Sequence, residues 1–318
     1  MSSSPRIFPG IPLVESPLFE AELVNSDLQS VERDIAVQLN RNGYAVIDFP
    51  DPSIDEKFDR IRARLGPCFG LAEDGSGDKA SLAGQRIQDA WQFDEDVSAI
   101  ASNPAVLDLL TKLYGRRAFP FQTLNFPVGT QQALHTDSVH FSSIPERFMC
   151  GVWVAMEDVG PNSGPLTYVP GSHRWPIMSN AMIGRRGWQS ELNSAQDPYG
   201  DAWNAMIRAQ GAQQETFCAR KGQALIWSAN LLHGGSARLD VDLTRWSQVT
   251  HYYFDDCIYY TPAFSDEPLG RLALRNIVDA STGLKVSNRY LNETLEQPQP
   301  QRPGRPSGFS RRLRKIFR

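Results

Sequence analysis

The chain has 318 residues, a formal net charge of −4, a hydrophobic fraction of 41% and a charged fraction of 21%. This composition is that of an ordinary globular protein with one large domain or two small ones, which excludes a fibrous or globally disordered chain. We expect no transmembrane helix, because no stretch approaches ~18 uncharged apolar residues. We also expect no secretory signal, because the N-terminal sequence has no basic segment followed by an apolar core. Four scattered cysteines form no zinc or disulfide pattern, so we expect a cytoplasmic protein.

Charge is unevenly distributed along the chain. Residues 297–318 contain seven basic residues and no acidic one, whereas residues 1–296 carry a net charge of −11. The acidic body argues against nucleic-acid binding. The tail is expected to be disordered, but the apolar spacing in 309–318 also fits a short basic amphipathic helix. Peripheral contact with the inner face of the membrane is therefore an expectation, and a solvated tail without such contact is the alternative.

The first part of the chain shows helical periodicity. Residues 1–25 are rich in Pro and Ser and predict an irregular N-terminal arm. A domain is expected over 26–296, and it opens with a helix capped by Ser26 or Asp27 and ending before Gly43. Further elements are expected in chain order: a strand at 44–49, a helix at 54–65, a mobile loop at 70–88 and a helix from Asn103-Pro104 to Gly115.

Short strand-like segments follow from Ala118 onward. They are 118–126, 150–156, 164–170, 223–229 and 245–254. Strands after a helical opening predict an α+β domain with a β-sandwich or barrel core. The polar segment 175–215 interrupts the strands, is expected to contain a helix at 201–210, and has the length of an insertion that serves as a lid.

One histidine-carboxylate pair has the spacing of metal ligands. His135 and Asp137 lie two residues apart, so on a strand their side chains share one face. His233 could supply a third ligand from a distant strand. Two histidines and one carboxylate are the ligand set of non-haem Fe(II) oxygenases. Taken alone, however, a His-x-Asp triplet is common, and a histidine in a strand is usually a packed or surface residue.

An arginine downstream strengthens this interpretation. Arg245 begins a predicted strand twelve residues after His233, and Ser247 shares its face. A buried arginine beside a hydroxyl is suited to holding a carboxylate through paired charge-assisted hydrogen bonds. Arg238 is an alternative, but it lies in a turn-like segment and fits less well.

At these residues the sequence resembles the phytanoyl-CoA dioxygenase family of Fe(II)/2-oxoglutarate-dependent oxygenases. The resemblance runs from about Leu39 to Phe254, and the segments that carry it are NRNGYAVI, QQALHTDSVHF, VWVAMEDVGPNSGPLTYVPGSHRWP and KGQALIWSANLLHGG. It implies a double-stranded β-helix, a cupin-like jelly-roll, with packed N-terminal helices. It also implies a set of site residues: Fe(II) at His135, Asp137 and His233, and 2-oxoglutarate at Arg245 with help from Ser247 and Gln132.

The resemblance also implies an activity. Because Asp137 fills the position that related halogenases leave to Gly or Ala, hydroxylation of a C–H bond is expected rather than chlorination. The position before the PGSH segment at which several members carry a threonine is Leu166 here, with Thr167 one residue away. Two alternatives stay open: a non-catalytic jelly-roll binding protein, and a cupin-type metal enzyme that does not use 2-oxoglutarate.

The substrate is not defined by any motif, and a small molecule, a lipid or a glycan are all compatible with the sequence. His140, Gln122 and Asn125 are candidate substrate contacts from their positions near the predicted ligands. For His251 and Trp227 the sequence favours packing in the core, and His173 is expected to stabilise a turn.

Overall fold

The computed structural model describes residues 6–192 and 194–295. Within these residues no helix is long and apolar enough to cross a membrane. The basic tail over 297–318, with its amphipathic segment 309–318, lies outside the described residues.

The N-terminal arm is more ordered than the sequence predicted. A 3-10 helix at Leu13–Glu15 and the helix α1 (Phe19–Val24) replace the expected irregular segment. The reason is packing, since Leu13 and Phe19 are buried in the main core. The prediction of an irregular arm over 1–25 is therefore wrong for this stretch.

The predicted helices are present with small changes at their ends. Helix α2 (Ser30–Asn42) begins after Gln29, whose backbone N–H donates to Glu32 Oε2 at 2.8 Å, so neither Ser26 nor Asp27 is the cap. The remaining helices of the described chain are α3 (Ile54–Leu65), α4 (Glu95–Ala101), α5 (Pro104–Tyr114) and α6 (Gly200–Gln210). Helix α4 escaped prediction because its seven residues offer too little periodicity, and α6 matches the helix expected at 201–210.

Two antiparallel sheets form the centre of the fold. The larger has six strands in the order β1 (Tyr44–Asp48), β8 (Gln223–Ser228), β5 (Met149–Ala155), β10 (Ser247–Phe254), β3 (Ala118–Phe126) and β2 (Ile87–Gln88). The smaller has three strands in the order β7 (Glu215–Phe217), β6 (Leu166–Tyr168) and β9 (His233–Gly235). The expected strands are thus confirmed.

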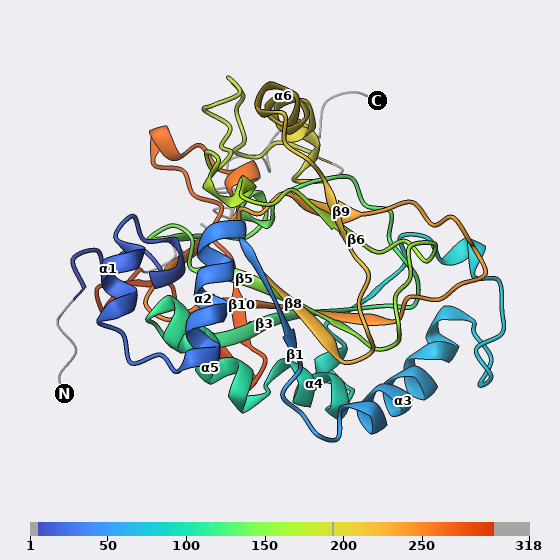
Figure 1. The fold of residues 1–318 in the computed structure, drawn as a ribbon. Helices are drawn as coiled ribbons and strands as arrows, with labels where there is room; N and C mark the ends of the chain where they lie inside the picture. The colour runs from blue at the N-terminus through green and yellow to red at the C-terminus, as the bar shows by residue number, and fades with distance from the viewer. Residues whose placement is uncertain (1–5, 193, 296–318) are drawn as a thin grey trace, which may run out of the picture.

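The large sheet is covered on both faces. Figure 1 shows α2, α5, α4 and α3 on one side and β6 with β9 on the other. Side chains along β5 point alternately to the two faces of the large sheet. Val152 and Val154 pack in the cluster that contains the helices, and Trp153 packs between the two sheets. A double-stranded β-helix core with packed N-terminal helices, as the sequence predicted, is the observed fold.

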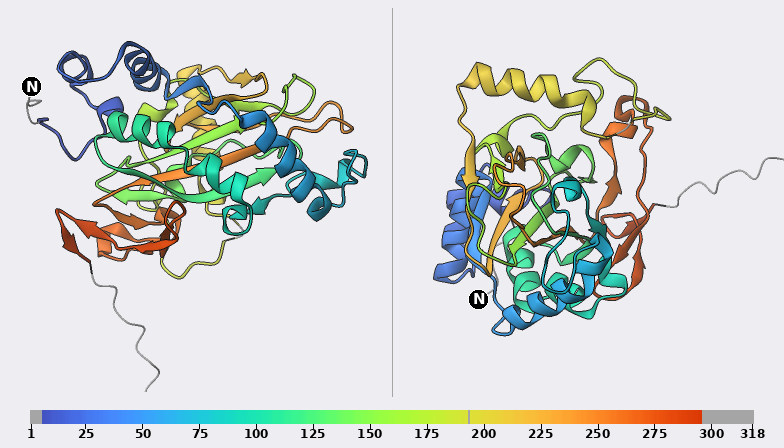
Figure 2. Two further views of the ribbon diagram at one scale, coloured as in Figure 1. Left: turned by 90° about the horizontal axis from the view of Figure 1, so that it is seen from below. Right: turned by 90° about the vertical axis from the view of Figure 1, so that its right-hand side faces the viewer.

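Smaller elements complete the chain. Three two-stranded antiparallel sheets are β4 (Ser142–Ile144) with β11 (Ile258–Tyr260), β12 (Ile277–Asp279) with β13 (Leu284–Val286), and β14 (Arg289–Tyr290) with β15 (Glu293–Thr294). Further 3-10 helices occupy Gly66–Phe69, Ala80–Leu82, Ala90–Gln92, Asp137–Val139, Ser172–Arg174, Asp197–Tyr199, Pro262–Phe264 and Glu267–Leu269. Figure 2 shows the pairs β12–β13 and β14–β15 on the opposite side of the molecule from α1 and α2.

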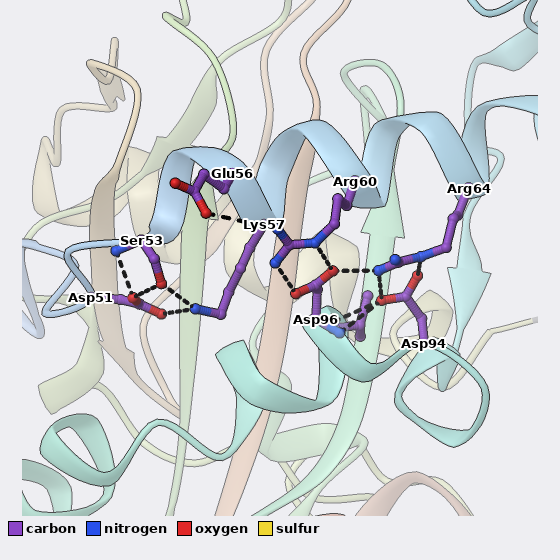
Figure 3. A network of polar contacts seen from close by, with 9 residues as sticks. Asp51, Ser53, Glu56, Lys57, Arg60, Arg64, Asp94 and Asp96 are labelled. Carbon is purple, nitrogen blue, oxygen red and sulfur yellow. Dashed lines mark hydrogen bonds and ion pairs between the residues drawn. The ribbon is translucent and has the colours of Figure 1, made fainter.

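An ion-pair network fastens α3 to the start of α4 (Figure 3). Arg60 donates two hydrogen bonds to Asp96, at 2.9 and 2.7 Å. Arg64 donates two to Asp94, at 2.7 and 2.9 Å. The same Asp94 caps α4 by accepting from the backbone N–H groups of Asp96 and Val97. The network therefore fixes the position of a helix that covers β3.

Candidate active site

A single backbone bridge brings the two predicted histidine ligands together. The N–H of His135 donates to the carbonyl of His233 at 2.9 Å, and the N–H of His233 donates back to His135 at 2.9 Å. Their rings consequently lie 4.5 Å apart between centroids. Asp137 was expected to lie on a strand with His135, but it begins a 3-10 helix instead. Its side chain still points to the same site because Thr136 between them is extended, with φ −111° and ψ 142°.

The three side chains form a group able to hold a metal ion. One ligand atom from each of His135, Asp137 and His233 lies within 4.8 Å of the others. Both Nδ1 atoms lie 2.9 Å from a backbone carbonyl two residues earlier, at Ala133 and Leu231. This contact assigns the proton to Nδ1 and leaves each Nε2 lone pair facing Asp137.

The protonation states suit metal binding. Burial lowers the pKa of His135 to about 3, and its ring is neutral at neutral pH. Burial opposes ionisation of Asp137, yet the surrounding imidazoles and a hydrogen bond from Trp227 outweigh it and lower its pKa to about 2. A neutral imidazole and an ionised carboxylate are the forms that coordinate a cation.

Two residues that the sequence assigned to the core contact the carboxylate of Asp137. Trp227 donates from Nε1 to Asp137 Oδ2 at 2.7 Å, and His251 Nε2 lies 3.6 Å from the same oxygen. Their burial matches the expectation of core packing, but their polar contacts were missed. The sequence could have placed His251 in the site, because it lies an even number of residues after Ser247 on one strand and therefore shares its face. No feature of the sequence could have placed Trp227 there, because its approach to Asp137 depends on the pairing of β8 with β5.

Arg245 lies buried in the same cavity without a hydrogen-bond partner. Its side chain is 1% exposed, and neither Nε nor Nη1 finds an acceptor among the described residues. The hydroxyl of Ser247 and Nε1 of Trp153 are also buried without a hydrogen-bond partner among the described residues. Burial lowers the pKa of Arg245 to about 10, so the guanidinium stays charged at neutral pH. By contrast, Arg238 donates to the backbone carbonyls of Lys79 and Val241, which assigns it a structural role.

Most of the predicted site residues line one cavity of about 190 Å³, and the two that do not are Ser247 and Asn125. Gln132, Gln122 and His140 line it together with the three candidate ligands and Arg245. Asn125 does not line it, which corrects the prediction of a substrate contact. Its Nδ2 donates to Gln248 Oε1 at 3.3 Å, because Asn125 and Gln122 are three residues apart on β3 and face opposite sides.

Further contacts complete the cavity wall. Leu166 lines the cavity, and Thr167 turns away and donates to the carbonyl of Glu215 at 2.9 Å. The insertion contributes Gln196, whose Oε1 accepts from Gln132 Nε2 at 3.1 Å. No motif within 175–215 pointed to this residue. His173 has the structural role expected of it, since its ring lies against Gly43 and 3.1 Å from the carbonyl of Asn40.

These residues define a class of protein: a jelly-roll with two imidazoles and a carboxylate at one end of its cavity, the donor set of non-haem Fe(II) oxygenases. Residues 39–239 match the family described as Phytanoyl-CoA dioxygenase (PhyH). The match spans more than half of the chain, and the protein belongs to this family. The prediction from the sequence is thereby confirmed, as are Fe(II) and 2-oxoglutarate as the cofactors of an oxygenase of this type.

Solved structures share the fold at low sequence identity. The carbocyclase SnoK from nogalamycin biosynthesis, described as non-heme and alpha ketoglutarate dependent, is 17% identical with a TM-score of 0.59, over 82% of this chain and 97% of its own. EctD from S. alaskensis with 2-oxoglutarate and 5-hydroxyectoine is 17% identical with a TM-score of 0.56, over 84% and 87%. The epimerase SnoN, solved with Fe3+, alpha ketoglutarate and nogalamycin RO, is 19% identical with a TM-score of 0.53, over 72% and 86%. No curated protein matches the chain.

Proposed function

We propose that this protein hydroxylates an unactivated C–H bond of a small molecule, with His135, Asp137 and His233 holding Fe(II) and Arg245 holding the distal carboxylate of 2-oxoglutarate. One observation carries the assignment of the co-substrate site: Arg245 is a fully buried cation whose donors face no acceptor. A buried unpaired charge is costly, so a cavity that contains one is suited to an anionic ligand.

The residues fit both groups. The three candidate ligands offer two neutral nitrogens and one anionic oxygen on one side of the cavity, which leaves open positions on a six-coordinate ion. Arg245, with Ser247 beside it, matches the planar acceptor pair of a carboxylate. Gln132, with Nε2 3.3 Å from His135 Nε2, is placed to contact either group.

When bound, iron and 2-oxoglutarate supply the oxidising chemistry: 2-oxoglutarate and O₂ become succinate and CO₂, and the second oxygen atom of O₂ enters the substrate C–H bond. The protein orients these groups and excludes water. Trp227 and the two backbone carbonyls hold the ligands in place, and Trp153 and Val249 form apolar walls of the cavity.

Other outcomes are supported by the neighbours, because SnoK is described as a carbocyclase and SnoN as an epimerase. All three outcomes begin with the same bound groups, and the mass of the product separates them. Hydroxylation adds one oxygen atom, ring closure removes two hydrogens, and epimerisation leaves the mass unchanged. A lipid or glycan substrate and membrane contact through 309–318 stay predictions.

The test is anaerobic addition of Fe(II) and 2-oxoglutarate to the purified protein, with the visible charge-transfer band of the chelated pair as the readout. We expect a band in the wild type and a higher 2-oxoglutarate concentration for half-saturation in Arg245→Gln. Arg220→Gln is the matched control, because Arg220 is an exposed arginine paired with Asp48. No band in folded wild-type protein would favour the binding-protein or 2-oxoglutarate-independent alternatives.

A further inference from the structure

The charges around the cavity do not balance when its proposed occupants are counted. Asp137 is the one acidic residue among those lining the cavity, and Arg86 and Arg245 are its two arginines. The two positive charges of Fe(II) and the one on Arg245 offset Asp137 and the two carboxylates of 2-oxoglutarate. The charge of Arg86 is left over, in a protein whose residues 1–296 are strongly acidic.

Arg86 is held at the rim by the sheet. It directly precedes β2, whose Ile87 and Gln88 pair with Asn125 and Leu124 of β3. Its side chain is exposed, lines the cavity, and makes no hydrogen bond or ion pair with any residue in the described part of the chain. An exposed arginine is unremarkable alone, so the relevant observation is a second cation without a carboxylate partner that packs against the wall of the same cavity.

The second cation is Arg275, behind the aromatic wall of the same cavity. Its guanidinium carbon lies 4.6 Å from the ring centroid of Phe141, which lines the cavity. Its Nη1 donates to the carbonyl of His140 at 3.4 Å and to Thr261 Oγ1 at 3.3 Å. Its Nε is buried without an acceptor, and no described carboxylate pairs with it.

These two arginines come from distant parts of the chain and approach the same residue. Arg275 donates to the carbonyl of His140, and the side chains of Arg86 and His140 line the same cavity. Among the described residues that line the cavity, no carboxylate outside the metal site offsets the charge of these arginines on a ligand group near His140. The field is strongest for a group that reaches Arg86 directly, since Arg275 stands behind Phe141.

We propose that the substrate carries an anionic group, a carboxylate or a phosphoryl group, that binds Arg86 at the cavity rim, with Arg275 adding a second positive charge behind the His140–Phe141 wall. The proposal rests on the proposed function, because it takes iron and 2-oxoglutarate as the other occupants. It places the reacting C–H bond on the part of the substrate that extends inward from this anion toward His135 and His233.

The test is equilibrium dialysis of isotope-labelled methylphosphonate and, separately, acetate against the full chain loaded anaerobically with Fe(II) and saturating 2-oxoglutarate. Saturating co-substrate keeps both probes from Arg245, and chloride holds the ionic strength constant. The two probes distinguish a phosphoryl from a carboxylate group. The variants are Arg86→Gln and Arg275→Gln, with Arg220→Gln as a control of equal charge change at an exposed site.

We expect saturable binding of one equivalent of a probe to the wild type. Arg86→Gln should weaken it about tenfold or more, which is the loss of one charge-assisted contact. Arg275→Gln should weaken it less, and Arg220→Gln should leave it unchanged. Absence of saturable binding in the wild type, or equal weakening by Arg86→Gln and Arg220→Gln, would overturn the proposal.

The charge-transfer band in the same samples separates this proposal from the proposed function. A band without Arg86-dependent binding contradicts the anion subsite alone. Arg86-dependent binding without a band contradicts the proposed function and supports the subsite, and loss of both signals contradicts both.

Discussion

Gly151 packs against the indole of Trp227 with no room for a side chain, and this contact gives a sharp prediction. A Cβ added at Gly151 would lie 2.2 Å from Cζ2, 2.3 Å from Cε2 and 2.7 Å from Cη2 of that ring. Gly151 lies opposite Trp227 in the β5–β8 register and opposite His251 in the β5–β10 register. Its φ is not in the left-handed region, so alanine meets a steric obstacle and no backbone strain.

Gly151→Ala should therefore move the indole and lengthen its 2.7 Å hydrogen bond to Asp137. Overpacking of a core costs about 1–3 kcal/mol, and we expect this loss in the free energy of unfolding. A supporting partner of a metal ligand is worth roughly 10–100-fold in metal affinity, so Fe(II) binding should weaken by at least about tenfold.

The assay pairs urea unfolding of the metal-free protein with anaerobic Fe(II) titration. Gly160→Ala is the control, because a Cβ there meets nothing within 4 Å. Trp227→Phe removes the donor without overpacking, and combining it with Gly151→Ala should restore part of the stability but none of the metal affinity. A Gly151→Ala protein as stable and as metal-avid as the wild type would refute this reasoning.

Three further outcomes are expected. Asp137→Ala should abolish succinate formation while the protein stays folded by circular dichroism, and near-normal turnover would contradict the ligand assignment. Asp96→Asn should lower the free energy of unfolding by about 1 kcal/mol at pH 7, a value reduced for the partial exposure of its arginine partners. Because pairing lowers the pKa of Asp96 from 3.8 to about 2, this difference should be full above pH 3.8 and vanish as the pH falls through 2, measured by urea unfolding across that range. Gly234→Ala should weaken Fe(II) binding, since a Cβ there would lie 2.6 Å from the carbonyl oxygen of Gln132, and unchanged affinity in the same titration would contradict this role for the glycine.

Local signals were sufficient for the longer helices and for bringing His135 and Asp137 together. Asn103 before Pro104 marked the start of α5 correctly, because a side-chain cap acts on the N–H groups of its own first turn, those of Ala105 and Val106. The triplet from His135 to Asp137 was similarly informative, since one extended residue between two side chains is enough to place them on one side. Asp137 lies in a 3-10 helix and not on the expected strand, yet the extended Thr136 still places its side chain on the same side as that of His135.

What failed depended on contacts between distant segments. Trp227 approaches Asp137 only because β8 pairs with β5 at a glycine, and Gln196 contacts the cavity residue Gln132 from an insertion without a motif. The order in 13–24 arises from burial against the main core, which outweighs a Pro- and Ser-rich composition. Asn125 was an error of another kind, since the period of two along β3 excludes a shared face with Gln122 and could have been applied from the sequence alone.

Gly234 and Gly235, which follow His233, explain how a short sequence motif positions the two histidine ligands. The two histidine ligands are joined by one isolated bridge, which is little sheet structure to fix a metal site. Close approach compensates for this, because a Cβ on Gly235 would lie 2.9 Å from the backbone nitrogen of Gln131, and one on Gly234 would be closer still to the neighbouring backbone. The segments around 131–135 and 233–235 can pass at this separation only without side chains there. The chain therefore holds its two histidine ligands by backbone proximity, and Trp227 on β8 of the large sheet holds the carboxylate of Asp137.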